Sequence, residues 1–312
     1  MKHLISLEHC TTDWMAGILA SAAEIKAHPD RFGDAFKRRT LMMIFEKPSL
    51  RTRVSFETGA TQMGGHAIYY NLANSPLSSG KENVADLVRV VSRYVDIIMA
   101  RLFEQAHIEE MARLASIPVI NALTNYEHPC QILADLQTIQ EHKGRLAGLR
   151  LAYFGDGNNN VTHSLLFGCA KMGMHIAVAS PKGHEYSPLD EVVDSAVRTG
   201  QKTGAQITIT TDPHEAAHQA DVLYTDSWMS YHIPEHKKEA RIKVFMPYQV
   251  NADLMKRAKP DAIFMNCLPA VRGAEQTAEV IDGPQSVVFD EAENRLHVQK
   301  AIMLRLLAEA KS

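Results

Sequence analysis

Short apolar segments alternate with longer segments of helical periodicity along the chain, and this alternation constrains the fold more than any other feature. Apolar runs of strand length occur at residues 39–45, 67–70, 96–100 and 119–120, and again at 149–154, 176–179, 206–210, 222–225 and 263–265. Segments with the spacing of amphipathic helices separate most of these runs. Such alternation predicts parallel β-sheets with helices on both faces, the α/β class.

A polar, glycine-containing stretch at residues 141–148 interrupts the pattern before it starts again. The 312 residues suit two domains at about 150 residues each. We therefore predict two doubly wound parallel-sheet domains, residues 1–146 and 147–291. A final amphipathic helix, residues 292–312, is expected to pack back onto the first domain.

Composition excludes several classes of protein. Lys and Arg number 33 against 36 Asp and Glu, a net charge of −3, so no global positive field attracts nucleic acid. No apolar stretch approaches the roughly 20 residues that cross a bilayer. The N-terminal segment has no apolar run typical of a signal peptide, so we expect a cytoplasmic protein. The four cysteines form no C-x-x-C pair, which favours reduced thiols, and the histidines and cysteines lack metal-ligand spacing.

The first polar cluster, Ser49-Leu50-Arg51-Thr52-Arg53, follows a predicted strand and begins a predicted helix. A helix N-terminus offers free backbone N–H groups and partial positive charge, to which hydroxyls and guanidiniums add donors. This combination suits a phosphate group. The simpler alternative is that Ser49 only caps the helix and the arginines are solvated.

A second cluster places His128 and Gln131 three residues apart, on one face of a predicted helix. Together they could hold a small group that has both a carbonyl oxygen and an amide nitrogen. Arg101, at the end of the strand at 96–100, is a further candidate. The alternative for His128 is a capping role.

In the second half, residues 155–160 read Gly-Asp-Gly-Asn-Asn-Asn between a strand and a helix. The dinucleotide fingerprint G-x-G-x-x-G needs glycine where Asn160 stands, so NAD binding is disfavoured. The amides instead suit a zwitterionic small molecule. Two more polar segments follow later strands, one beginning at Asp226 and one containing Cys267, whose thiol could alternatively be buried and inert.

Taken together, these motifs resemble the ornithine carbamoyltransferases, over almost the whole chain. The segments that carry the resemblance are Ser49-Leu50-Arg51-Thr52-Arg53, His128-Pro129-Cys130-Gln131, Asp226 to Ser230, Cys267-Leu268-Pro269 and Glu293-Asn294-Arg295-Leu296-His297. Their order and spacing agree with the predicted domain plan.

The resemblance implies transfer of a carbamoyl group from carbamoyl phosphate to L-ornithine, as in arginine biosynthesis, without metal or cofactor, in a cleft between the two domains. Arg101, His128, Asp226 and Cys267 would be the catalytic residues. The residues implied for carbamoyl phosphate are Ser49, Leu50, Arg51, Thr52, Arg101, His128, Gln131, Cys267, Leu268 and Arg295. Those implied for ornithine are Asn160, with Asn159 as the neighbouring alternative, Asp226, Ser230 and Tyr231.

The chain departs from the family pattern at two places. Ser230-Tyr231-His232 stands where the family usually has Ser-Met-Gly, and Asn266 precedes Cys267 where the family usually has histidine. The first departure leaves open another acceptor amine such as putrescine. The second should change only a supporting hydrogen bond, because asparagine can both donate and accept. A non-catalytic homologue and an NAD-dependent oxidoreductase are the alternatives from other classes.

The resemblance also implies a homotrimer or a multiple of it, in which a loop from one subunit reaches the neighbouring active site. Residues 74–82 occupy the matching place and are polar and glycine-containing. The alternative is a solvent loop without function.

Overall fold

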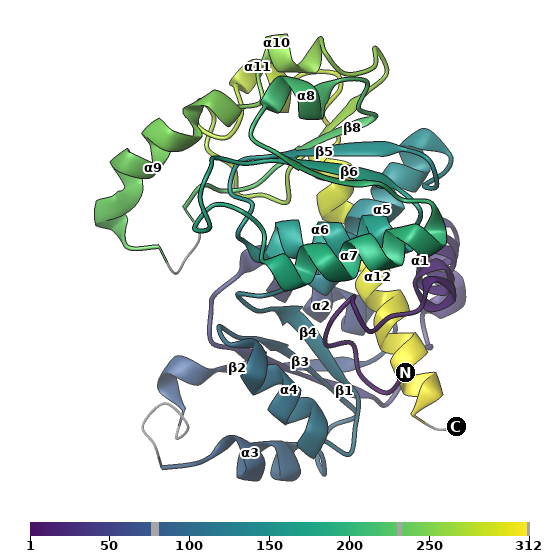
Figure 1. The fold of residues 1–312 in the computed structure, drawn as a ribbon. Coiled ribbons are helices and arrows are strands. Elements are labelled where there is room, and N and C mark those ends of the chain that lie inside the picture. The colour runs from purple at the N-terminus through teal and green to yellow at the C-terminus, as the bar shows by residue number, and fades with distance from the viewer. Residues whose placement is uncertain (76–80, 230–232, 311–312) are drawn as a thin grey trace. The chain divides into compact units, whose positions relative to one another are not determined.

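A computed structural model describes residues 1–75, 81–229 and 233–310. The chain divides into two compact units, Met1–Gln137 with Glu293–Ser312, and Thr138–Ala292. The division falls inside the two helices α5 (Pro129–Lys143) and α12 (Val288–Glu309) (Figure 1). The assignment of substrates to residues 1–146 and 147–291 stays a prediction.

The first unit contains a four-stranded sheet in the order β2-β1-β3-β4. Its strands are β1 (Thr40–Phe45), β2 (His66–Asn71), β3 (Ile97–Arg101) and β4 (Val119–Leu123), and every pairing is parallel. Phe45 at the end of β1 pairs in register with Arg101 at the end of β3. The carboxyl ends of these two central strands therefore lie side by side.

Strands β1, β3 and β4 are buried along nearly their whole length because helices cover the first sheet. Helices α3 (Val84–Val91) and α4 (Gln105–Leu114) share a core with this sheet through Leu87, Val88, Ile108 and Met111. Figure 1 shows both helices beside the sheet. The helices of this region are α1 (Thr12–Ala27), η1 (Pro29–Phe32), α2 (Leu50–Gln62), η2 (Leu72–Asn74), α3 (Val84–Val91) and α4 (Gln105–Leu114).

The second unit contains a five-stranded parallel sheet in the order β7-β6-β5-β8-β9. Its strands are β5 (Arg150–Phe154), β6 (His175–Ala179), β7 (Ile207–Thr210), β8 (Val222–Thr225) and β9 (Ile263–Met265). Phe154 pairs with Thr225, so the ends of β5 and β8 are adjacent. The prediction of two parallel-sheet α/β domains is confirmed.

One face of the second sheet is covered by short helices, whose residues Ala216, Leu254 and Val280 share a core with Phe154 and Phe264. The helices of this unit are α6 (Asn160–Lys171), α7 (Asp190–Thr203), α8 (Pro213–Ala217), η3 (Glu235–Lys237), α9 (Lys238–Phe245), η4 (Met246–Tyr248), α10 (Ala252–Met255) and α11 (Ala278–Ile281). Sequence periodicity did not reveal α9 or α11, because α9 buries only Arg241 and Phe245 and α11 is a single turn. In the part of the chain that the structure describes, no helix combines the length and apolar character needed to cross a membrane.

Candidate active site

Both sheets have a point where the strand order changes direction, and several candidate residues follow the strands on either side of it. In the first unit it falls between β1 and β3, and in the second between β5 and β8. Ligands of doubly wound sheets bind beyond the carboxyl ends of strands at such points. Thr52 and Arg101 follow or end the first pair of strands, and Asn160 and Asp226 follow the second pair.

The Thr52 hydroxyl in the first unit is hydrogen-bonded to two arginine side chains. Its Oγ1 accepts hydrogen bonds from Arg101 Nη1 at 3.5 Å and from Arg295 Nη2 at 3.2 Å. Arg295, on α12, also donates from Nη1 to Gln131 Oε1 at 2.5 Å. All four side chains are buried. The structure thus brings together four residues predicted from three separate motifs and one strand end.

Gln131 is oriented by a residue that the sequence analysis did not select. Gln131 Nε2 donates to Asp135 Oδ1 at 2.8 Å, one helical turn further along α5. Because the amide nitrogen is held by this carboxylate, the amide oxygen faces Arg295. Asp135 therefore fixes which end of the Gln131 amide is an acceptor.

His128 directly precedes α5 and is buried beside the same cations. Burial, followed by the charges of Arg295, Arg101 and Lys47, lowers the pKa of His128 well below its ordinary value. The imidazole is therefore neutral at neutral pH, with one N–H donor and one acceptor nitrogen. A neutral ring can donate to a carbonyl oxygen without adding a further positive charge.

Ser49 caps helix α2, because its hydroxyl accepts a hydrogen bond from the Thr52 backbone N–H at 3.3 Å. Leu50 is exposed, so only its backbone can serve a ligand, and Arg51 is half-buried. Arg53 lies apart from these roles, since it pairs with Glu57 at 3.2 Å and covers the ring of Tyr69. The structure thus shows that Ser49 caps α2, which both interpretations of this cluster expect.

Lys47 is a further cation near Arg101 and His128, and the sequence analysis did not select it. It is buried, donates from Nζ to Asn125 Oδ1 at 3.2 Å and lies 4.5 Å from the centroid of the Phe103 ring. Burial, with the nearby charge of Arg101, lowers the pKa of Lys47 to about 8. The signal available in the sequence was its place in the polar turn between β1 and α2.

In the second unit, Cys267 and Asp226 are in contact. The Cys267 thiol donates to Asp226 Oδ1 at 3.2 Å, and both side chains are half-buried. Leu268 adopts a left-handed backbone with φ of 55°, and its N–H donates to Asn266 Oδ1 at 2.8 Å. Asn266 also donates to Gln276 Oε1 at 3.2 Å. Asparagine here both accepts and donates in support of the Cys267 segment.

The structure distinguishes the neighbours Asn159 and Asn160. Asn159 caps α6, since its Oδ1 accepts from the Thr162 N–H at 2.8 Å, and its Nδ2 donates to Tyr153 and to the Asp156 carbonyl. Its buried amide is thereby occupied by the fold. Asn160 is the first residue of α6 and is half-buried, which leaves it better placed for a ligand.

Asp156 and Arg241 form a buried ion pair that the sequence analysis also missed. Arg241 Nε donates to the Trp228 carbonyl oxygen at 2.8 Å. Burial raises the pKa of Asp156 to about 7, although the charge of Arg241 opposes that rise. Two predicted ornithine residues, Ser230 and Tyr231, lie outside the described residues, as does part of the loop at 74–82.

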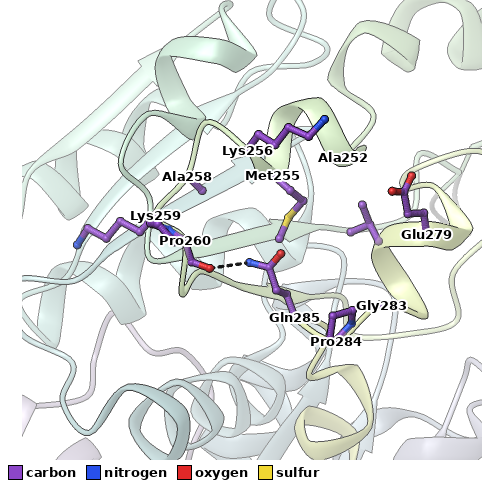
Figure 2. Close-up of a pocket in the computed structure, with 11 residues that line it drawn as sticks. Ala252, Met255, Lys256, Ala258, Lys259, Pro260, Glu279, Gly283, Pro284 and Gln285 are labelled. Atoms are coloured by element: carbon purple, nitrogen blue, oxygen red, sulfur yellow. Dashed lines mark hydrogen bonds between the residues drawn. The ribbon is translucent and has the colours of Figure 1, made fainter.

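A cavity of about 490 Å³ in the second unit lies elsewhere (Figure 2). It is lined by residues of α10 and by segments at 258–260 and 283–285, the first of which leads into the amino end of β9. Lys259 pairs with Asp221 at 2.7 Å, and Gln285 donates to the Pro260 carbonyl at 3.5 Å. Since these polar groups hold the fold together, the cavity is not the candidate site. Among the described residues, no group of three or more His, Cys, Asp or Glu side chains could hold a metal.

Comparison with known proteins gives full-length matches. Residues 2–141 match the family described as "Aspartate/ornithine carbamoyltransferase, carbamoyl-P binding domain", and residues 147–306 match its "Asp/Orn binding domain". The ornithine carbamoyltransferase of Bacillus subtilis is 50% identical over 100% of this chain and 95% of its own length, and that of Anoxybacillus flavithermus is 54% identical over 98% and 96%.

Solved structures agree with these matches. The ornithine carbamoyltransferase of Pyrococcus furiosus superimposes with a TM-score of 0.92 at 46% identity, covering 97% of this chain and 96% of its own. The anabolic ornithine carbamoyltransferase of Campylobacter jejuni does so with a TM-score of 0.92 at 36% identity, covering 99% and 100%.

Proposed function

Since the chain belongs to the aspartate/ornithine carbamoyltransferase family, we propose that it transfers the carbamoyl group of carbamoyl phosphate to the side-chain amine of L-ornithine, giving citrulline and phosphate. Relatives at about 50% identity over full length carry the name ornithine carbamoyltransferase. They favour this reaction over transfer to putrescine and over a non-catalytic role. The product belongs to arginine metabolism.

One observation carries the proposal: two buried guanidiniums converge on a single hydroxyl at the start of a helix. Arg101 and Arg295 both donate to Thr52 Oγ1, and Thr52 lies in the first turn of α2. A phosphate dianion suits this position because guanidiniums and helix-start N–H groups are its preferred donors. Ser49, Arg51 and the Leu50 backbone would complete the phosphate contacts.

Uncharged side chains and the Arg101 guanidinium would activate the carbamoyl carbonyl group. His128 and Gln131 would hold the carbamoyl oxygen and amide nitrogen, while Thr52 and Arg101 donate to the oxygen as it gains negative charge. Donors already in place stabilise this charge without reorganisation. Loss of one such donor costs about 2.7–4 kcal/mol in the transition state.

Ornithine binding is assigned to the second unit. Asn160, Asp226, Ser230 and Tyr231 would hold the amino-acid head group, and Cys267 with Asp226 would position the side-chain amine. The amine must be neutral to attack, and with an ordinary pKa of about 10.4 its deprotonation at pH 7 costs about 4–5 kcal/mol. Desolvation and nearby acceptors offset this cost.

The reaction proceeds by addition and elimination. The neutral amine nitrogen forms a bond to the carbamoyl carbon, and the C–O bond to phosphate then breaks. The departing phosphate takes the proton that the amine loses. The Cys267 and Leu268 backbone would contact the carbamoyl group during these steps.

We propose three further assignments. Residues 1–146 would bind carbamoyl phosphate, and residues 147–291 ornithine. We place the protein in the cytoplasm and expect a homotrimer or a multiple of it. A mass in solution near the single-chain value of 34.7 kDa would contradict the oligomer.

The experiment that tests the proposal is a comparison of acceptor amines. The purified chain is mixed with carbamoyl phosphate and ornithine, putrescine, lysine or aspartate, and carbamoylated product and phosphate are followed together. Citrulline formation should far exceed every other product. A higher kcat/KM for putrescine, or no turnover with any amine, would overturn the assignment.

A further inference from the structure

Glu275 is a buried carboxylate that the proposed mechanism does not use. It lies between β9 and α11 and is 3% exposed. Its Oε1 accepts a hydrogen bond from the Trp228 backbone N–H at 3.4 Å, and its Oε2 accepts one from the Val271 N–H at 3.1 Å. One side chain therefore bonds two segments that are far apart in the sequence.

These two segments carry the residues assigned to ornithine. Trp228 stands two residues after Asp226, and Val271 stands three residues after Leu268 in the segment that begins with Cys267. Between them, the Cys267 thiol donates to Asp226 Oδ1 at 3.2 Å. The two hydrogen bonds of Glu275 thus fix the distance between the two segments, and the contact between Cys267 and Asp226 depends on that distance.

The carboxylate is itself held in place. The Glu275 carbonyl accepts from the Val250 N–H at 3.0 Å, and the Gly273 N–H donates to the Gln276 carbonyl at 2.8 Å across the same turn. Gln276 Nε2 donates to the Val271 carbonyl at 3.2 Å. The turn therefore presents the Glu275 carboxylate from a fixed backbone.

Trp228 is held from its other side as well. Its carbonyl oxygen accepts from Arg241 Nε at 2.8 Å, and its buried ring stacks on Phe245 with centroids 5.8 Å apart. Both backbone polar groups of Trp228 are thereby engaged, the N–H by Glu275 and the carbonyl by Arg241. Movement of Trp228 requires breaking one of these bonds.

We propose that Glu275 is a positioning residue for the acceptor amine, which sets the spacing between the Asp226 segment and the Cys267 segment. The proposal rests on the assigned ornithine site. Only a carboxylate offers two acceptor oxygens here, because glutamine would turn an NH₂ donor toward one of the two N–H groups. Burial raises the pKa of Glu275, while the N–H groups that it accepts from oppose that rise.

The test uses Glu275→Gln with three readouts. The KM for ornithine should rise at least about tenfold, as expected for the loss of one hydrogen bond to a charged group. The dissociation constant for inorganic phosphate should not change. Alkylation of Cys267 by iodoacetamide should change several-fold in rate, and it can be followed selectively because Cys10, Cys130 and Cys169 are buried.

Asp221→Asn is the matched control. Asp221 is also a buried carboxylate of the second unit, and its Oδ2 accepts from the Arg150 backbone N–H at 2.9 Å, but it lies at the amino ends of the strands. The control should lose stability like Glu275→Gln while keeping the wild-type KM and alkylation rate. If Glu275→Gln does not fold, Glu275→Asp replaces it, with the same expectation because the shorter side chain cannot reach both segments.

Equal ornithine KM and equal Cys267 alkylation in wild-type protein and the Glu275 variant would overturn the proposal. The alkylation rate separates this failure from failure of the proposed function. If wild-type protein makes no citrulline but the Glu275 variant alone alters Cys267 reactivity, the positioning role stands and the ornithine assignment fails.

Discussion

The polar sets of the two units are built in opposite ways. In the first unit, the groups that would touch the ligand are themselves the buried framework: Thr52, Arg101 and Arg295 are 1%, 5% and 3% exposed and bond to one another. In the second unit, Asp226 and Cys267 are half-buried and stand on loops.

The second set is held indirectly. Buried groups that would not touch the ligand, Asp156, Arg241 and Glu275, bond to backbone atoms of the loops or to each other. The difference shows two ways to orient functional groups. Under the proposed function, the buried cations would hold the charged ligand directly, whereas the acceptor amine would meet groups that are positioned by buried residues with no ligand contact of their own.

Loss of a buried cation in the first unit should have the largest effect. Arg101→Met removes a donor to Thr52 and to the developing oxyanion, so kcat/KM for carbamoyl phosphate should fall about 10²–10³-fold. Steady-state citrulline formation measures this. Arg53→Met is the control, because Arg53 is exposed and paired with Glu57, and it should change the rate less than threefold, as about 0.5 kcal/mol implies. Similar losses of kcat/KM in Arg101→Met and Arg53→Met would contradict the expected difference between a buried cation and one on the helix surface.

A change in the second unit should affect one substrate only. Asp226→Asn keeps the size of the side chain but removes the charge that accepts from Cys267, so the KM for ornithine should rise about 10–100-fold. Affinity for carbamoyl phosphate should stay the same. The exposed Asp253, paired with Lys256, provides the control Asp253→Asn. Weaker carbamoyl phosphate binding in Asp226→Asn would contradict the separate assignment of the two substrates to the two units.

The third prediction concerns pH and the charge of Lys47. With its pKa lowered to about 8, Lys47 is cationic below that pH and loses its charge as pH rises through 8. Affinity of the wild-type protein for inorganic phosphate should therefore weaken several-fold between pH 7 and 9. Lys47→Met should bind phosphate more weakly at pH 7 and show a flatter profile. A wild-type affinity independent of pH over this range would contradict a role for Lys47.

The fourth prediction concerns stability. Burial raises the pKa of Asp156 from 3.8 to about 7, so the folded state binds more protons than the unfolded state between these values. The Asp156 contribution to the unfolding free energy should then fall by about 2 kcal/mol as pH rises from 5 to 7.5. Denaturant unfolding of wild type and Asp156→Asn measures it. A wild-type pH dependence identical to that of Asp156→Asn would show that Asp156 does not titrate in this range.

The fold was readable from the sequence because its strands are short, buried apolar runs. Residues at the ends of those runs, such as Arg101 and Asp226, could be selected because parallel strands place their carboxyl ends along one edge. Asn159 and Asn160 could not be separated by sequence, because only the cap geometry shows that the Asn159 amide is occupied.

The supporting residues were not readable for a different reason. Glu275 bonds to Trp228 across 47 positions and Arg241 to Asp156 across 85, so no local pattern identifies either pair. Asp135 was visible as a polar residue one turn after Gln131, but its effect on the orientation of that amide depends on Arg295, 164 positions from Gln131. Contacts of this range are determined by the tertiary fold alone.

The central claim is that the buried cations of the first unit bind the phosphate and the loops of the second unit do not. Calorimetric titration of inorganic phosphate into wild type, Arg101→Met and Asp226→Asn tests it most directly. Wild type and Asp226→Asn should share one dissociation constant, while that of Arg101→Met should be at least about tenfold weaker. An unchanged dissociation constant in Arg101→Met, or a weaker one in Asp226→Asn, would contradict the account.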